Sequence, residues 1–197
     1  MNVILLRHGE TEWSRAGRHT GRTDLPLTPH GEEQARALSR LVAGRSFALV
    51  LVSPALRARR TAELAGAGSY EVDPNLWEWD YGGYEGITTA EIRRSRPGWY
   101  VWRDGVVPGD EAHPGETVEH VGERADKVLA RIRQADGDVL VVAHAHILRV
   151  LAARWLSLPA DHGRLFRLDT GTYSVLGHEH DAPVLLHWNV PATDVPA

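Results

Sequence analysis

The N-terminal stretch MNVILLRHGE, residues 1–10, decides how the rest of the chain is interpreted. Val3–Leu6 is apolar at every position, which is typical of a strand that helices cover on both faces of a sheet. A glycine alone would end such a strand, so the Arg7-His8 pair in front of Gly9 needs a second explanation. The stretch therefore predicts a buried strand that leads directly into a functional site.

The composition is that of a globular protein with one sizeable core. The chain has 197 residues, of which 43% are hydrophobic and 24% charged. Its net charge of −4 excludes a general basic field for nucleic acid. The absence of cysteine excludes disulfides and thiolate metal sites. The aliphatic runs are too short to span a bilayer, and no secretory signal pattern is visible, so a cytoplasmic protein without membrane contact is expected.

Strand and helix patterns alternate along the chain. Further strands are expected at 48–52, 70–72, 139–143, 173–177 and 184–188, and helices at 29–42, 54–65, 89–94, 118–132 and 145–156. Such alternation predicts an α/β fold, a three-layer α/β/α sandwich with a mostly parallel central sheet and an antiparallel edge strand. We expect a single domain over residues 1–197, with 74–115 as a cap-like excursion over the active site.

Polar clusters follow three of the predicted strands. Arg7-His8 follows Leu6, Ser53 and then Arg57 follow Val52, and His144 follows Ala143. In a parallel α/β sheet these strand ends share one edge, where ligands bind. Two arginines and two histidines together form a site for a dianion, and guanidinium groups match phosphate oxygens. The sequence therefore predicts a phosphate site on an acidic protein.

The histidines predict chemistry beyond binding. A neutral imidazole can accept a phosphoryl group and release it to water, while arginines stabilise the charge on the transferring oxygens. The leaving alkoxide also needs a proton. Glu78 lies between Trp77 and Trp79, where a partly shielded carboxyl could supply that proton.

Two other interpretations of the same residues are less favoured. The pairs His144/His146 and His178/His180 could ligate a metal, but such pairs arise by chance among 11 histidines and no spacing specifies a third ligand. The tryptophans and tyrosines of 74–115 could stack on bases, but few basic residues lie among them. We expect no metal and no nucleic-acid partner, and interpret these aromatic residues as packing.

Six ordered blocks of the sequence resemble the histidine phosphatase superfamily, which includes the phosphoglycerate mutases. The blocks are RHGET, RHTGRTDLPLT, SPALRARRTAEL, LWEWDYGGYEG, PGETVEHVGER and VVAHAHILR, and they cover nearly the whole chain. The resemblance implies a phosphoglycerate mutase-like fold and catalysis without a metal or other cofactor.

The resemblance also implies roles for individual residues. His8 would be the phosphorylated nucleophile and Glu78 the general acid and base, with Arg7, Arg57 and His144 around the phosphate. Arg18, Thr20 and Gly21 fall in a loop that meets substrate in relatives, and the amide of Ala145 would be a further donor. Ser14 stands where mutases carry asparagine, which would weaken one phosphate contact, and Ala145 replaces a common glycine.

The interval between Glu78 and His144 favours a phosphatase. In the mutases this segment is longer and carries more basic residues for a second phosphate; here Arg93, Arg94, Arg96 and Arg103 are its arginines before the PGET block. Several motifs resemble the branch that contains fungal sedoheptulose-1,7-bisphosphatase and actinobacterial acid phosphatases. The expected function is a phosphomonoesterase with a phosphohistidine intermediate, whose substrate is a small phosphate ester such as a sugar phosphate.

Three alternatives stay open from the sequence. They are a mutase dependent on 2,3-bisphosphoglycerate, an inactive protein that binds a phosphorylated ligand, and a metal-dependent hydrolase. The oligomeric state is also open, and a homodimer paired through an edge strand is one alternative. Substrate specificity is expected to depend on residues 15–24 and 82–115.

Overall fold

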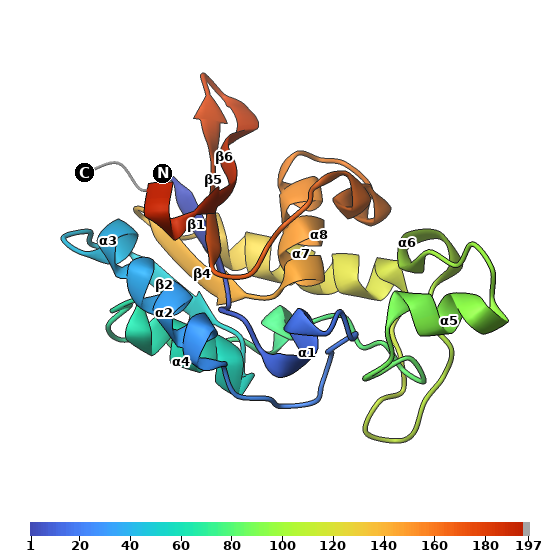
Figure 1. Ribbon diagram of the computed structural model, residues 1–197. Coiled ribbons are helices and arrows are strands. Elements are labelled where there is room, and N and C mark those ends of the chain that lie inside the picture. Colours follow the sequence, from blue (N-terminus) through green and yellow to red (C-terminus); the bar gives the residue numbers. More distant parts are fainter. Residues whose placement is uncertain (195–197) are drawn as a thin grey trace.

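Six strands form one sheet, in the order β3-β2-β4-β1-β5-β6, in the computed structural model, which describes residues 1–194 (Figure 1). The strands are β1 (Val3–Arg7), β2 (Leu49–Val52), β3 (Glu71–Val72), β4 (Val139–Ala143), β5 (Thr172–Glu179) and β6 (Ala182–Pro191). The first four pair in parallel, and β5 is antiparallel to both β1 and β6. The predicted mostly parallel sheet with an antiparallel pair at one side is confirmed, and β6 is the strand at that edge.

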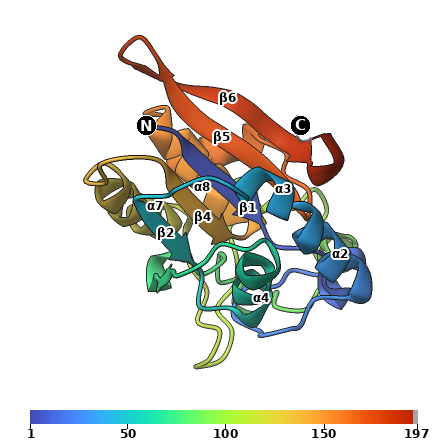
Figure 2. The ribbon, with the colours of Figure 1, turned by 90° about the vertical axis from the view of Figure 1, so that its left-hand side faces the viewer.

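Helices cover both faces of the sheet, which confirms the three-layer fold (Figures 1 and 2). The helices are α1 (Glu12–Arg15), α2 (Pro29–Ala37), α3 (Ser39–Val42), α4 (Leu56–Leu64), α5 (Thr89–Ser95), α6 (Val101–Asp104), α7 (Val118–Ile132) and α8 (Ala145–Trp155), with 3-10 turns η1 (Pro74–Leu76), η2 (Ala160–Leu165) and η3 (Ala192–Asp194). One layer contains α2, α3 and α4, and the other contains α7 and α8. None of the helices in residues 1–194 is long and apolar enough to cross a membrane.

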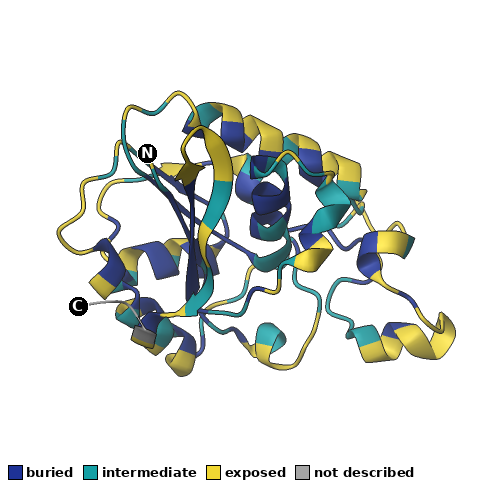
Figure 3. Cartoon of the chain, turned by 90° about the horizontal axis from the view of Figure 1, so that it is seen from above, coloured by how far each residue is buried: buried dark blue, intermediate teal, exposed yellow. Residues whose placement is uncertain are grey.

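The strand β4 shows why the sheet lies at the centre. All five of its residues are fully buried, in the interior that Figure 3 colours dark blue. Val139 and Val141 pack toward α7 and α8, whereas Leu140 and Val142 pack toward α2 to α4. Side chains alternate between the two faces of a strand, so a strand apolar at every position can fill both cores.

The helix starts agree with their sequence signals. Thr28 is the N-cap of α2, where its hydroxyl accepts a hydrogen bond from Gly31 N, and Pro29 is the first helical residue. Thr117 caps α7 in the same way through His120 N.

The expected helix at 29–42 is instead two helices that meet at Leu38. The buried stripe of that segment is kept across the junction, because Leu38 is buried together with Ala35 before it and Leu41 and Val42 after it.

Residues 74–115, which were expected to form a cap, contain α5 and α6, and α6 lies near the start of α7 (Figure 1). The backbone of this segment pairs with the loop after α1, since His19 N donates to Ile87 O and Arg18 bridges to Thr88. Its aromatic residues are largely buried in the same core as α7 and α8; these are Trp79, Tyr81, Tyr84, Trp99 and Trp102. The packing interpretation of these side chains is confirmed, and the segment places Glu78 beside the sheet edge.

Candidate active site

The ends of three neighbouring strands converge, as the sequence predicts. β2, β4 and β1 are adjacent in the sheet, and they lead into Ser53, His144 and His8. His144, from the middle strand, reaches both neighbours: its ring centroid lies 5.0 Å from that of His8, and its Nε2 lies 2.7 Å from Ser53 Oγ. Parallel strands thus bring together residues that are 136 positions apart.

His8 carries a nitrogen that is suited to nucleophilic attack. Its Nδ1 lies 2.7 Å from the carbonyl oxygen of Gly9, which only accepts, so Nδ1 bears the proton and Nε2 keeps its lone pair. Burial, followed by the charges of Arg57 and Arg7, holds the pKa of His8 well below its usual range. The imidazole is therefore neutral at neutral pH.

Gly9 serves close packing in the structure. A Cβ at Gly9 would lie 2.1 Å from the carbonyl oxygen of Gly31 at the start of α2. The backbones of the two segments therefore touch, and Gly9 N also donates to Thr61 Oγ1. The glycine after His8 fixes the strand end against α2 and α4.

Arg57 and His144 lie behind His8 and are completely buried. Arg57 Nε donates to His144 Nδ1 over 3.1 Å, because a guanidinium has no acceptor. His144 therefore bears its proton on Nε2 and donates it to Ser53 Oγ. Burial and the charge of Arg57 lower the pKa of His144 well below its usual value, so this histidine is also neutral.

Arg7 lies on the wall of a cavity beside His8, and one of its nitrogens is unsatisfied. Its Nη1 donates to the carbonyl oxygen of Leu168. Its Nε is the one buried side-chain nitrogen or oxygen of residues 1–194 without a hydrogen-bond partner within the protein. A buried guanidinium N–H without a partner costs free energy unless a ligand accepts its hydrogen bond. This position suits an anionic oxygen.

Glu78 is held at the start of α8. Its Oε1 accepts hydrogen bonds from Ile147 N and Trp79 N at 2.9 and 3.0 Å, and its Oε2 accepts one from His146 N at 2.9 Å. The residue is 4% exposed. Three backbone amides therefore fix the orientation of its carboxyl group, two from the first turn of α8 and one from Trp79.

The cavity beside His8 has a volume of 160 Å³, and most of the expected site residues line it. Seven of those residues are on its wall: Arg7, His8, Ser14, Arg18, Thr20, Glu78 and Ala145. Three are not: Arg57 and His144 lie in the layer behind, and Gly21 donates its N–H to Glu85. Ser14 uses its hydroxyl in the capping box of α1, with Thr11.

Tyr81, His146 and His19 also line this cavity, and the sequence analysis did not assign them to the site. Tyr81 Oη lies 2.6 Å from His146 Nδ1. Burial raises the pKa of Tyr81 and lowers that of His146, so the phenol donates to a neutral imidazole. Burial also lowers the pKa of His19 to about 4. Two signals in the sequence could have pointed to this wall. Tyr81 follows Glu78 by three positions, and His146 follows His144 by two.

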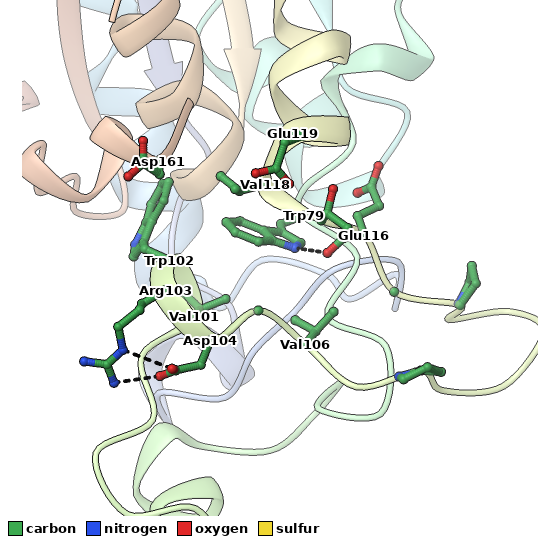
Figure 4. A pocket seen from close by; sticks show the side chains of 15 residues that line it. Trp79, Val101, Trp102, Arg103, Asp104, Val106, Glu116, Val118, Glu119 and Asp161 are labelled. Carbon is green, nitrogen blue, oxygen red and sulfur yellow. Dashed lines mark hydrogen bonds and ion pairs between the residues drawn. The ribbon is translucent and has the colours of Figure 1, made fainter. Parts of the chain in front are cut away.

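A larger cavity of 640 Å³ lies away from His8 (Figure 4). It opens between α6, η2 and the start of α7, with Trp79 and Trp102 among its walls and Glu119 and Asp161 at its rim. The indole Nε1–H of Trp79 donates to the carbonyl oxygen of Glu116 there. The smaller cavity is the candidate active site, because His8, Arg7 and Glu78 all line it. Within residues 1–194, no group of three histidine or carboxylate side chains could hold a metal ion.

The sequence is similar to a known family and to known proteins over most of its length. The profile of the histidine phosphatase superfamily (branch 1) matches residues 3–191. An acid phosphatase of Mycobacterium tuberculosis is 42% identical over 182 residues, which cover 90% of this chain and 87% of the relative. A sedoheptulose 1,7-bisphosphatase of Saccharomyces cerevisiae is 39% identical over 188 residues, covering 79% and 67%.

A solved structure of an open reading frame from M. tuberculosis superimposes with a TM-score of 0.89 and 39% identity, and the match covers 97% of this chain and 98% of that one. Sequence and fold thus agree over nearly the full length. The chain therefore belongs to the histidine phosphatase superfamily, branch 1.

Proposed function

We propose that the protein is a phosphomonoesterase that transfers the phosphoryl group of a small phosphate ester to His8 and then to water. One observation carries the proposal: His8, whose Nε2 keeps its lone pair, Arg7, whose Nε has no partner within the protein, and the carboxyl group of Glu78 all line one cavity of 160 Å³. A nucleophile, an anion site and a proton-transfer group are the three parts that phosphoryl transfer to a histidine requires.

In the first step, His8 Nε2 forms a bond to phosphorus as the bond between phosphorus and the ester oxygen breaks. Glu78 gives its proton to the departing oxygen. In the second step, Glu78 takes a proton from water as the water oxygen attacks phosphorus and the N–P bond breaks. Alcohol and inorganic phosphate are released, and His8 and Glu78 return to their starting states.

The surroundings of His8 support this cycle. Because Gly9 accepts the Nδ1 proton, the imidazole is oriented by its backbone and can carry a phosphoryl group on Nε2. Arg7 offers Nε to a phosphoryl oxygen. Arg57 and His144 lie behind His8 and do not line the cavity. Arg57 supplies a buried positive charge that stabilises the transferring phosphoryl group, and the ring of His144 packs against His8.

The cap favours hydrolysis over mutase chemistry. A mutase must hold a second phosphate, which requires additional cations on the cavity wall. The cap arginines are used elsewhere: Arg96 donates to Tyr84 Oη, Arg93 to Trp99 O and Arg103 to Asp104. Neither these three nor Arg94 lines the cavity.

We further propose that the alcohol part of the substrate is uncharged and rich in hydroxyl groups, as in a sugar phosphate. The wall formed by Tyr81, His146, His19 and Thr20 offers neutral donors and acceptors. Hydroxyl groups can satisfy such a wall, whereas a carboxylate would need a cation there. The second arginine of the cavity, Arg18, donates to the carbonyl oxygen of Gly86 and is not one of these four wall residues. The relative from S. cerevisiae is named for a sugar phosphate, but sedoheptulose 1,7-bisphosphate carries a second phosphate group, which the substrate proposed for this chain lacks.

The test is a screen for phosphate release from sugar phosphates, phosphoglycerates and phosphoamino acids, run with and without a chelator. We expect turnover of sugar phosphates that the chelator does not change. A parallel assay follows conversion of 3-phosphoglycerate to 2-phosphoglycerate with added 2,3-bisphosphoglycerate. Isomerisation faster than phosphate release would show that the protein is a mutase. Binding of substrate without turnover would indicate an inactive protein. Loss of activity with the chelator would indicate a metal enzyme. Cell fractionation would test the expected cytoplasmic location.

A further inference from the structure

Glu85, in the cap, holds a loop that the catalytic mechanism above does not use directly. Both of its carboxylate oxygens accept a hydrogen bond from Gly21 N at 2.9 Å, and Oε1 accepts a second from Thr23 N at 3.1 Å. Glu85 is half-buried and does not line the cavity beside His8. Its carboxylate is therefore engaged with the backbone of 20–23.

The same loop is bound from its other side by Arg57. Arg57 Nη1 donates to Thr23 O at 2.9 Å, and Nη2 donates to Gly21 O at 3.0 Å and to Thr20 O at 3.4 Å. The loop thus points N–H groups at an anion and C=O groups at a cation, so both charges favour one orientation of its peptide dipoles. Burial lowers the pKa of Arg57, and the nearby carboxylates, Glu85 among them, oppose that effect.

Gly21 allows the loop to lie directly on the carboxylate. A Cβ at this position would be 2.9 Å from Glu85 Oε2 and 2.6 Å from the carbonyl oxygen of Trp79. No larger residue fits without moving the loop or Glu85. The contact between the loop and the cap is therefore close as well as charged.

The chain of contacts continues from Arg57 to the nucleophile. Arg57 Nε donates to His144 Nδ1, which sets the tautomer of His144, and the His144 ring packs on His8. We propose that Glu85 is a positioning residue for phosphoryl transfer, which acts through the 20–23 loop and Arg57. This inference rests on the proposed function, because it assigns Glu85 to the same site.

A double-mutant cycle tests whether Glu85 acts through Arg57. Glu85→Gln keeps the shape of the side chain but removes its charge and turns an amide NH₂ toward a backbone donor. We expect kcat to fall roughly tenfold or more with KM changed less than about threefold. In an Arg57→Ala background, the same substitution should change kcat by less than about twofold. Glu111→Gln, an exposed change in the same cap, is the control and should leave both constants unchanged.

A spectroscopic readout separates positioning from general damage to the fold. In ¹⁵N-histidine spectra, Glu85→Gln should shift the Nδ1 signal of His144 and weaken orthovanadate binding about tenfold, while Glu111→Gln should do neither. Equal losses of kcat in both backgrounds would overturn the inference, as would wild-type kinetics together with an unshifted His144 signal. If Arg57→Ala does not fold, the His144 signal and vanadate binding of Glu85→Gln decide. If the wild type releases no phosphate, the proposed function fails, and the same two measurements still decide the role of Glu85.

Discussion

The strand ends and the cap contribute different walls of one cavity, and they are built from different chemistry. At the strand ends, His8 and His144 are fixed by the sheet, and their partners are backbone groups or buried charges. In the cap, Tyr81 presents a neutral hydroxyl that donates to His146 at the start of α8. Under the proposed function, the sheet edge would perform the phosphoryl transfer, which any phosphate ester needs, whereas the cap wall would select the alcohol.

Removal of the nucleophile is the largest change that can be made to the sheet edge. His8→Ala should lower kcat at least about a thousandfold for every substrate, because no other neutral imidazole replaces Nε2. Phosphate release from a sugar phosphate and from p-nitrophenyl phosphate measures this. A loss confined to one of the two substrates would break the division between a general edge and a selective cap.

Glu78 connects the two regions, so its effect should depend on the leaving group. Glu78→Gln should lower kcat roughly 10²- to 10⁴-fold for an alkyl ester, whose alkoxide needs a proton. The loss should be much smaller for p-nitrophenyl phosphate, since p-nitrophenolate leaves without protonation. Equal losses for both esters would show that Glu78 does not protonate the leaving oxygen.

Acid should destabilise both walls of the cavity, because buried neutral histidines lie at each of them. The pKa of His19 is lowered to about 4, and those of His8, His144 and His146 are lowered well below their usual value. The unfolded chain therefore binds more protons than the native protein below pH 6.5, and stability falls as the pH falls. Each such histidine contributes a slope of about 1.4 kcal/mol per pH unit.

Urea unfolding between pH 7.5 and 4.5 measures that slope. A free energy of unfolding that stays constant or rises on acidification would show that these histidines are already protonated in the native state. His19→Gln should reduce the slope between about pH 6.5 and 4, the range that separates the two pKa values of His19. The reduction measures how much of the slope comes from this histidine, which packs against Tyr81 of the cap.

The contact between the loop at 20–23 and the cap can be tested by overpacking. Gly21→Ala should cost roughly 1–3 kcal/mol of stability because its methyl group meets Glu85 and the Trp79 backbone. It should also lower kcat, because the loop supports Arg57. Gly66→Ala is the control: it strains a backbone with φ 73° in open space, so it should reduce stability and leave kcat unchanged. Activity lost equally in both variants would contradict a specific role for this contact.

The smallest expected effect separates the cap wall from general catalysis. Tyr81→Phe removes one hydroxyl and should cost about 0.5–1.5 kcal/mol in kcat/KM for a sugar phosphate. It should have little effect with p-nitrophenyl phosphate. Tyr84→Phe removes a hydroxyl that accepts a hydrogen bond from Arg96 and lies off the cavity, so it should not change this selectivity.

The sheet edge could be predicted from the sequence because its information is local. Uniformly apolar runs specify β1 and β4, and in a parallel sheet the residues after such strands must meet. Threonines such as Thr28 and Thr117 mark helix starts by a local hydrogen bond. His8, His144 and Arg57 were therefore correctly expected to lie close together.

The remaining features depend on distant contacts that no short motif encodes. Arg57 was expected to face the ligand, but its guanidinium donates to carbonyl groups of a loop about 35 positions earlier in the chain. Tyr81 was interpreted only as a packing residue. Its hydroxyl group binds His146, which is 65 positions later in the chain, and no local pattern indicates that contact. The short helix α6 and the turn η2 lack a periodic pattern that could have predicted them.

The central claim is that His8 carries the phosphoryl group during turnover. Rapid-quench mixing of the enzyme with a ³²P-labelled sugar phosphate, followed by peptide mapping in alkali, tests it most directly. We expect a phosphate that is labile in acid and stable in alkali, located on the peptide that contains His8 and absent from His8→Ala. Turnover by direct hydrolysis without any labelled protein, or label on a different residue, would contradict the account.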